Sequence, residues 1–228
     1  MTEAAAIVLA AGSGDRLGAE IPKAFVPLGG RPLLVHAIGA LRACPRIGEI
    51  VVAVPDGWAS RARALLGSDP RCTVVTGGAT RRDSVRAALD AVPSDAASIV
   101  CHDAARPLAP SWLVDAVLGG LVDADGVVPG IPVVDTVKRV EGGFVVRTEP
   151  RDGLVAVQTP QAFRADALRA AHARLAALDG TGVTDDAMAI EAAGGRVRIV
   201  PGEPRAFKVT DADDLARAEA LLAEAGAR

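Results

Sequence analysis

Short apolar runs alternate with amphipathic stretches along most of the chain. The first run, 6–10, contains no polar residue, which is typical of a strand buried on both faces of a parallel sheet. In 81–92, apolar residues recur at i, i+3, i+4 and i+7 from Val85, which predicts a helix that Thr80 would cap. The pattern predicts strands at 6–10, 49–55, 72–78, 97–107 (a strand running into a polar turn), 126–133, 153–163 (a strand and a turn), 196–202 and 206–210. It predicts helices at 32–44, 58–66, 81–92, 111–122, 164–178 and 186–193, and a last helix capped by Thr210 or Asp211.

This alternation of strands and helices predicts an α/β fold. We expect a single Rossmann-like, mostly parallel sheet with helices on both faces, joined by right-handed crossovers. Three polar turns, at 12–23, 77–84 and 102–106, follow the first, third and fourth predicted strands. Ligands of such sheets bind beyond the carboxyl ends of the strands. The three turns therefore predict one ligand site at a single edge of the sheet.

The alternation breaks at 135–152. Apolar and charged residues alternate loosely there around Gly142 and Gly143, which indicates a β-hairpin. The stretch has too little apolar surface to belong to the core. A protruding arm that completes a neighbouring subunit and a mobile lid are both consistent with it, and we favour the arm, with Asp135 ordering it. We expect 1–228 to form a single domain, with 135–152 as a hairpin arm subdomain.

Composition limits the class of protein further. Half of the 228 residues are hydrophobic, so the chain can bury one large core, and the net charge of −3 gives no general attraction for nucleic acid. No apolar run reaches the length of a membrane span, and the first residues do not resemble a signal peptide. The three cysteines and three histidines lack metal-ligand spacing. We therefore expect a cytoplasmic protein with reduced thiols, bound neither to nucleic acid nor to a membrane.

The turn at 12–23 has the composition of a phosphate-binding loop. Its glycines allow backbone N–H groups to approach an anion, and Arg16 and Lys23 supply positive charge. It lacks the Walker pattern, and an ordinary tight turn is the alternative. Lysine is rare in this chain, with 22 arginines against Lys23, Lys138 and Lys208. Because arginine replaces lysine almost everywhere, Lys23 and Lys208 are candidates for sites that need a compact ammonium group.

Several blocks of the sequence resemble a known family. LAAGSGDRLG, PKAF and PLGGRPLL resemble nucleotidyltransferases that join a sugar or alcohol phosphate to a nucleoside triphosphate. GGATRRDSVRAAL, HDAARP, PVVDTVKR, TPQAF, TDDA and FKVTDADDL, in this order, resemble the 2-C-methyl-D-erythritol 4-phosphate cytidylyltransferases of the non-mevalonate isoprenoid pathway. The resemblance implies in-line attack of that phosphate on the α-phosphorus of CTP. The products would be 4-diphosphocytidyl-2-C-methyl-D-erythritol and pyrophosphate, and no fused cyclodiphosphate synthase domain is expected after residue 228.

The resemblance also implies roles for individual residues. The catalytic residues would be Arg16, Lys23 and Lys208. The nucleotide would be held by Ala10, Ala11, Gly12, Gly78, Ala79, Ser84 and Ala104, with relatives carrying an acidic residue at position 79. Methylerythritol phosphate would contact Asp103, Arg106, Thr136, Arg151, Thr159 and Thr184. For Asp103 a turn carboxylate is the alternative, and for Thr184 a helix cap is.

The resemblance implies a cofactor and a partner as well. Magnesium, or another divalent cation, would offset phosphate charge, with Asp103 as a candidate ligand. The 135–152 arm would join two copies in a homodimer and bring Thr136 and Arg151 to the partner's substrate.

Two other functions fit the same motifs. A cytidylyltransferase for ribitol 5-phosphate would share most of them. A nucleotide-sensing module without turnover would keep the phosphate loop, but it would have no need for Arg16, Lys23 and Lys208 together.

Overall fold

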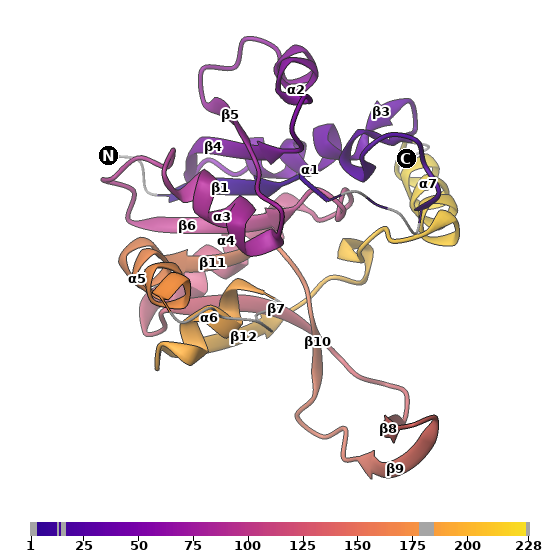
Figure 1. Ribbon diagram of the computed structural model, residues 1–228. Coiled ribbons are helices and arrows are strands. Elements are labelled where there is room, and N and C mark those ends of the chain that lie inside the picture. Colours follow the sequence, from indigo (N-terminus) through magenta and orange to yellow (C-terminus); the bar gives the residue numbers. More distant parts are fainter. Residues whose placement is uncertain (1–3, 13, 15–16, 178–184, 227–228) are drawn as a thin grey trace.

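A mixed eight-stranded sheet forms the centre of the protein (Figure 1). This computed structural model describes residues 4–12, 14, 17–177 and 185–226. The main strand order is β10-β7-β11-β6-β1-β4-β5, and β12 pairs with β7. The strands are β1 (Ala4–Leu9), β4 (Ile47–Val54), β5 (Cys72–Thr76), β6 (Ser98–Asp103), β7 (Gly126–Pro132), β10 (Val155–Val157), β11 (Gln161–Arg164) and β12 (Val197–Pro201).

The sheet is mostly parallel, as the alternation of elements predicts. β1 pairs in parallel with β4 and β6, β4 with β5, and β12 with β7. β10 and β11 run antiparallel to their neighbours, and β11 lies between β6 and β7. The sequence pattern indicated one strand and a turn at 153–163 and gave no sign of this insertion. Pro160, which has no N–H for a sheet ladder, separates the two short strands.

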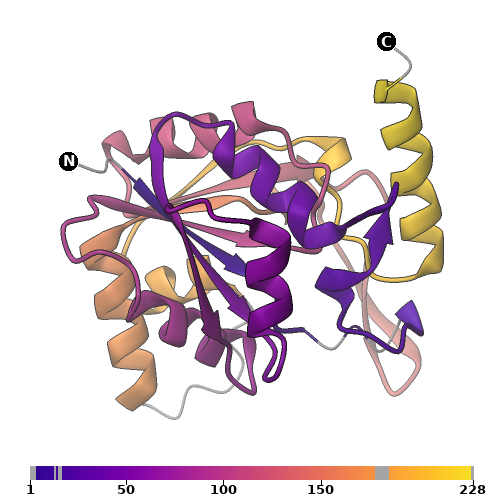
Figure 2. The ribbon, with the colours of Figure 1, turned by 90° about the horizontal axis from the view of Figure 1, so that it is seen from above.

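Helices cover both faces of the sheet (Figure 2). α1 (Leu33–Arg42), α2 (Ala59–Leu66) and α4 (Ser111–Gly119) pack on one face. α3 (Arg81–Leu89), α5 (Ala165–Ala177) and α6 (Asp186–Ala192) pack on the other. Alternate β1 residues belong to the two clusters, Ala6 and Val8 to the first, Ala5 and Ile7 to the second. Burial on both faces explains why the strand sequence is apolar throughout.

Five short elements and a C-terminal helix complete the fold, and one prediction in this part of the chain is wrong. The short elements are η2 (Lys23–Phe25), β2 (Pro27–Leu28), β3 (Arg31–Pro32), η3 (Gly120–Val122) and η4 (Pro204–Ala206), and the helix is α7 (Ala212–Gly226). The stretch 206–210 was predicted to be a strand but forms none. It makes no ladder with a strand, and its Val209 N–H donates to the Ala105 carbonyl, in the turn after β6, at 2.8 Å. Asp211, rather than Thr210, accepts the capping bond at the start of α7, from Asp214 N–H.

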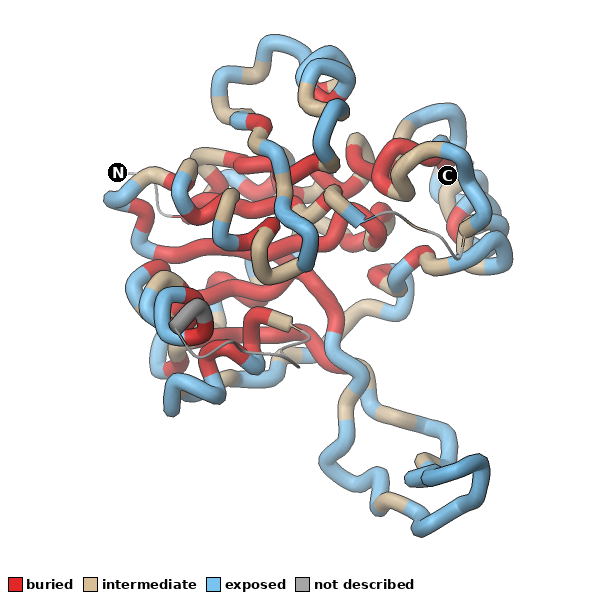
Figure 3. The backbone as a smooth tube through the Cα atoms, viewed as in Figure 1, coloured by how far each residue is buried: buried red, intermediate tan, exposed pale blue. Residues whose placement is uncertain are grey.

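The hairpin predicted at 135–152 is present and extends away from the body (Figure 1). It consists of β8 (Val137–Glu141) and β9 (Phe144–Glu149), joined at Gly142 and Gly143, whose φ angles are +56° and +86°. Two consecutive positive φ angles match the tight turn that favours glycine. The arm is exposed over nearly its whole length (Figure 3), and Phe144 is 80% exposed. No helix in the described part of the chain is long and apolar enough to cross a membrane.

Candidate active site

A cavity of about 760 Å³ opens at the carboxyl ends of β1, β4, β5 and β6. The turns after these strands form its walls, together with residues from η2 and from the segment that leads into α7. The predicted residues that line it are Ala10, Ala11, Gly12, Lys23, Gly78, Ala79, Ser84, Asp103, Ala104 and Lys208. The structure therefore brings together the polar turns at one sheet edge, as expected. Arg16 lies outside the described residues.

Glycines allow the turns of this cavity to approach each other closely. Gly14 has φ +78°, and a Cβ there would lie 2.5 Å from Cβ of Lys23. A Cβ on Gly77 would lie 2.6 Å from Cβ of Ala11 and 2.8 Å from Oγ of Ser84. Real Cβ atoms do not approach other heavy atoms this closely, so larger residues would push apart the β1 loop, the β5 turn and η2. The glycines thus set the position of Lys23.

The side-chain hydroxyl groups of Ser84 and Thr80 stabilise the turn between β5 and α3. Ser84 Oγ accepts from the Gly78 N–H at 3.1 Å and donates to the Thr80 carbonyl at 3.0 Å. Thr80 Oγ1 accepts from the Asp83 N–H, so Thr80 caps α3 as predicted. In this structure the Ser84 hydroxyl shapes the turn whose backbone lines the cavity.

Asp103, at the end of β6, is the centre of a charged cluster. Lys208 Nζ donates to its Oδ2 at 2.8 Å, and Arg81 Nε lies 3.6 Å from its Oδ1. Burial alone would raise the pKa of Asp103. The charges of Lys208 and Arg81 outweigh that effect and lower the pKa to about 2. The carboxylate is therefore ionised at neutral pH and fixes the side chain of Lys208.

Arg81 continues this cluster into the core. Its Nη2 donates to Oδ2 of Asp186 at 2.8 Å, and Asp186 also lies 3.1 Å from Nε2 of His172 on α5. Asp186 is 1% exposed. Burial would raise its pKa, but the hydrogen bond from His172 and the charge of Arg81 lower it. The sequence analysis gave Arg81 no role, although its place directly after the cap Thr80 was a usable signal.

A smaller cavity of about 190 Å³ adjoins the first. Asp103, Lys208 and Arg81 line both cavities, so their cluster lies where the two meet. The smaller cavity is also lined by Arg106, Val157, Gln158, Thr159, Gln161 and Asp185. The structure thus places the predicted Arg106 and Thr159 together, on the side of Asp103 away from the β1 loop.

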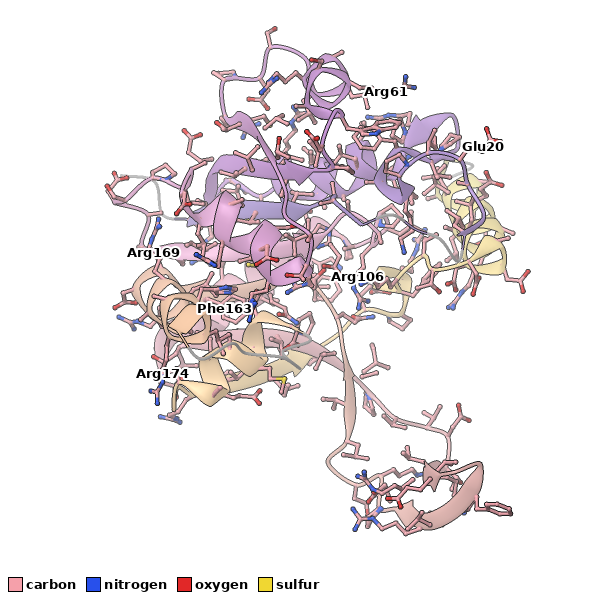
Figure 4. All side chains as sticks on the ribbon, in the orientation of Figure 1. Glu20, Arg61, Arg106, Phe163, Arg169 and Arg174 are labelled. Carbon is pink, nitrogen blue, oxygen red and sulfur yellow. The ribbon has the colours of Figure 1, made fainter. Side chains whose placement is uncertain are left out.

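Arg106, which is labelled in Figure 4, links two backbone segments. Its Nη1 donates to the Ala206 carbonyl at 2.8 Å and its Nη2 to the Val157 carbonyl at 3.3 Å. Gln158 makes a parallel link, since its amide exchanges two hydrogen bonds with the Glu203 backbone at 2.8 and 3.0 Å. These contacts hold the segment that carries Lys208 against β10. Burial lowers the pKa of Arg106.

His102 and Thr159 form a buried pair beside the smaller cavity. His102 Nδ1 lies 3.0 Å from Thr159 Oγ1, and the Asp103 N–H donates to the same oxygen at 3.0 Å. Burial lowers the pKa of His102 from 6.5 to about 4, only partly opposed by Asp103. The imidazole ring is therefore neutral at physiological pH.

The pKa of His102 predicts that the protein loses stability below neutral pH. Between pH 6.5 and about 4 the unfolded chain takes up a proton at His102 that the folded chain does not. The free energy of unfolding therefore falls as the pH falls, by up to about 3 kcal/mol at pH 4. Urea unfolding at a series of pH values measures the slope. In His102→Asn the slope should decrease by about one proton, and an unchanged slope would contradict the assignment.

Two predicted residues lie elsewhere. Thr136 and Arg151 are exposed on or beside the arm and line neither cavity of this chain. Arg151 donates to the Val134 carbonyl. Thr184 lies outside the described residues, and its neighbour Asp185 caps α6 by accepting from the Met188 N–H at 2.9 Å.

The donor set limits how a metal ion could bind. Within the described residues there is no group of three or more His, Cys, Asp or Glu side chains that could hold one. Asp56 and Asp103 are the carboxylates among the residues that line the larger cavity. This set fits a cation that is coordinated mainly by phosphate oxygens and water, because Mg²⁺ commonly uses one or two protein carboxylates.

Comparisons with known proteins agree with this geometry. The profile of the family "IspD: 2-C-methyl-D-erythritol 4-phosphate cytidylyltransferase" matches residues 4–224. An enzyme of that name from Frankia casuarinae is 52% identical over 96% of this chain and 81% of its own, and one from Nocardia farcinica is 48% identical over 95% and 93%. The crystal structure of the Thermus thermophilus enzyme is 36% identical, covers 95% of this chain and 97% of its own, and has a TM-score of 0.77. This chain therefore belongs to the 2-C-methyl-D-erythritol 4-phosphate cytidylyltransferase family.

Proposed function

We propose that the protein transfers the cytidylyl group of CTP to 2-C-methyl-D-erythritol 4-phosphate and releases pyrophosphate. The observation that carries this proposal is the pair of adjoining cavities that meet at Asp103 and Lys208. The larger cavity would hold CTP, and the smaller one the acceptor. The relatives are named for this activity. We further propose that 1–228 acts as one domain in a reducing cytoplasm, which suits its three free cysteines.

The chemistry requires charge neutralisation more than proton transfer. The attacking phosphate is already anionic, so the barrier lies in bringing two anions together and stabilising the charge that develops on the α-phosphoryl group. Lys23 and Lys208 enter the larger cavity from opposite ends of the chain. Both would bind the α-phosphate, with Arg16 on the outer phosphates. Backbone groups of 10–12 and 78–79, with Ala104, would hold the cytidine.

The smaller cavity would orient the acceptor for in-line attack. Asp103 would accept hydrogen bonds from its hydroxyl groups, and Thr159 and Arg106 would lie beside its phosphate. Because Thr136 and Arg151 line neither cavity of their own chain, we propose that the arm supplies them to a partner subunit in a homodimer. Thr184 would also contact the acceptor substrate.

A divalent cation would fit the larger cavity. Phosphate oxygens of the nucleotide and water would supply most of its ligands, with Asp103 as the protein carboxylate. When bound, it would offset the charge of the triphosphate. Asp103 is already within ion-pair distance of Lys208 and Arg81, so it would contribute weakly to metal affinity.

Pyrophosphate release tests the proposed function directly. The protein is incubated with CTP, Mg²⁺ and either methylerythritol phosphate or ribitol 5-phosphate. We expect turnover with methylerythritol phosphate and a kcat/KM at least tenfold lower with ribitol 5-phosphate. The reverse preference would establish the ribitol enzyme. Tight CTP binding without turnover on either acceptor would establish a sensing module.

Arg151→Ala should raise the KM for methylerythritol phosphate about tenfold or more and leave the KM for CTP nearly unchanged. Loss of a charge-assisted contact to the acceptor phosphate is the reason. Arg147→Ala, which removes another exposed arginine of the same arm, is the matched control.

Mixing Arg151→Ala with Lys23→Ala protein tests whether the arm acts across subunits. Hybrid dimers would contain one site with both residues intact, so part of the activity should return. Verified hybrids with no recovered activity would place both residues in the same subunit's site.

A further inference from the structure

Thr159 and His102 form a contact that the proposed mechanism leaves unexplained. Both residues are almost fully buried, at 4% and 1% exposure. His102 lies on β6, and Thr159 precedes Pro160 in the bend between β10 and β11. Their side chains meet at 3.0 Å beside the smaller cavity, which Thr159 lines.

The hydrogen bonds of the Thr159 hydroxyl can be counted. A threonine hydroxyl has one hydrogen to donate and two lone pairs to accept with. The Asp103 N–H, which can only donate, occupies one lone pair at 3.0 Å. The bond to His102 Nδ1 then takes either the second lone pair or the hydrogen, according to which ring nitrogen carries the proton.

The two tautomers of His102 leave different groups unpaired. Its Nε2 is buried and makes no hydrogen bond of normal geometry in the described part of the chain, and the backbone of Arg106, which raises the pKa of His102, is the other polar group near the ring. If Nε2 carried the proton, a buried N–H would remain unsatisfied, which is rare in folded proteins. If Nδ1 carries it, only a ring acceptor is left unpaired, which costs less because unsatisfied acceptors are the better tolerated kind. The structure favours the Nδ1–H tautomer.

With Nδ1 protonated, both lone pairs of Thr159 Oγ1 are filled by protein donors. The hydroxyl can then act toward any further group only as a donor. The charged groups around the smaller cavity are the cations of Arg106, Lys208 and Arg81 and the carboxylates of Asp103 and Asp185, so positive charge is in excess by one. Such surroundings select an anion, and a phosphate oxygen is an acceptor with no hydrogen to donate in return.

We propose that His102 is a positioning residue that fixes the Thr159 hydroxyl as a hydrogen-bond donor to the phosphate of the acceptor substrate. This inference rests on the proposed function, since the acceptor must bind in the smaller cavity. His102 itself touches no substrate. It acts through Thr159. Because the ring is neutral, Nδ1–H is its one donor, and this donor faces the Thr159 hydroxyl.

Steady-state kinetics of three variants test the proposal. His102→Leu removes the donor, whereas His102→Asn retains an N–H close to the place of Nδ1. We expect His102→Leu to raise the KM for methylerythritol phosphate about tenfold, with the KM for CTP within twofold. His102→Asn should recover most of that loss. His36→Leu, which removes another ring contact outside both cavities, should change neither KM.

A double-substitution cycle excludes a merely structural role. Thr159→Val should give the same KM defect as His102→Leu, and the double variant should be no worse than Thr159→Val alone. Additive defects, or equal rises in both KM values, would overturn the proposal.

The tautomer is measurable without any variant or activity. Nitrogen NMR of the ¹⁵N-histidine-labelled protein should show His102 with a protonated Nδ1 and an unprotonated Nε2. A protonated Nε2 would refute the inference even if the variants fail to fold. Turnover failure of the wild-type protein with methylerythritol phosphate would instead refute the proposed function, while the NMR result would still decide the state of His102.

Discussion

Lys23→Ala should lower kcat about 10²-fold or more while weakening CTP binding much less. A preorganised cation that acts on the charge developing at the α-phosphate typically contributes this much. Lys23 lines the larger cavity at the start of η2. Single-turnover kinetics and CTP titration separate the two effects. Lys138→Ala removes a lysine that donates to Thr148 on the arm, and it should leave kcat within twofold.

Gly14→Ala tests the placement of Lys23 without removing its charge. The added Cβ would collide with Lys23 Cβ, whereas Gly18→Ala meets nothing within 4 Å at a similar positive φ of +66°. Both variants carry comparable backbone strain, so only Gly14→Ala should lower kcat strongly. Equal effects of the two variants would show that strain, and not the position of Lys23, controls turnover.

Arg81→Met should be among the most destabilising single changes in the protein. It leaves the buried carboxylate of Asp186 without its arginine partner and removes one of the cations facing Asp103. Breaking a buried ion pair by removing one partner costs about 3–5 kcal/mol. For a chain of this size, 3 kcal/mol corresponds to a fall in Tm of about 6–12 °C. Calorimetry measures the change in Tm, and kcat should also fall because Asp103, which holds Lys208, loses one of the two cations that orient it.

A second substitution distinguishes the buried charge from lost packing. Asp186→Asn in the Arg81→Met background removes the unpaired carboxylate and should recover part of the lost Tm. If the double variant is as unstable as the sum of the single variants, the ion pair does not account for the stability.

The sequence was sufficient for the parallel part of the fold because the pattern there is unambiguous. The apolar run of β1 and the periodicity that starts at Val85 each match a single element type. β11 was missed because a strand of four residues is too short to show a hydrophobic period. Its antiparallel position in the sheet depends on β6 and β7, which are distant in the sequence. The prediction for 206–210 was wrong because a short apolar run indicates a strand whether or not another strand is available to pair with it.

Some residues of the site could be predicted from the sequence and others could not, because only some of them carry a local sequence signal. Glycine turns and rare lysines mark Lys23 and Lys208 in the sequence, and family resemblance adds Asp103. Arg81 is one of 22 arginines, and its partner Asp186 lies 105 residues away. Only the folded structure shows that pair. The link between His102 and Thr159 is likewise invisible in the sequence, since it joins β6 to a bend after β10.

The central claim is that Lys23 and Lys208 act together on the α-phosphate of CTP. A crystal structure with CTP and a non-reactive analogue of methylerythritol phosphate tests it most directly. We predict that both ammonium groups lie within hydrogen-bond distance, about 2.7–3.2 Å, of α-phosphate oxygens, with the acceptor oxygen opposite the pyrophosphate. A complex in which either lysine contacts no α-phosphate oxygen would contradict the account.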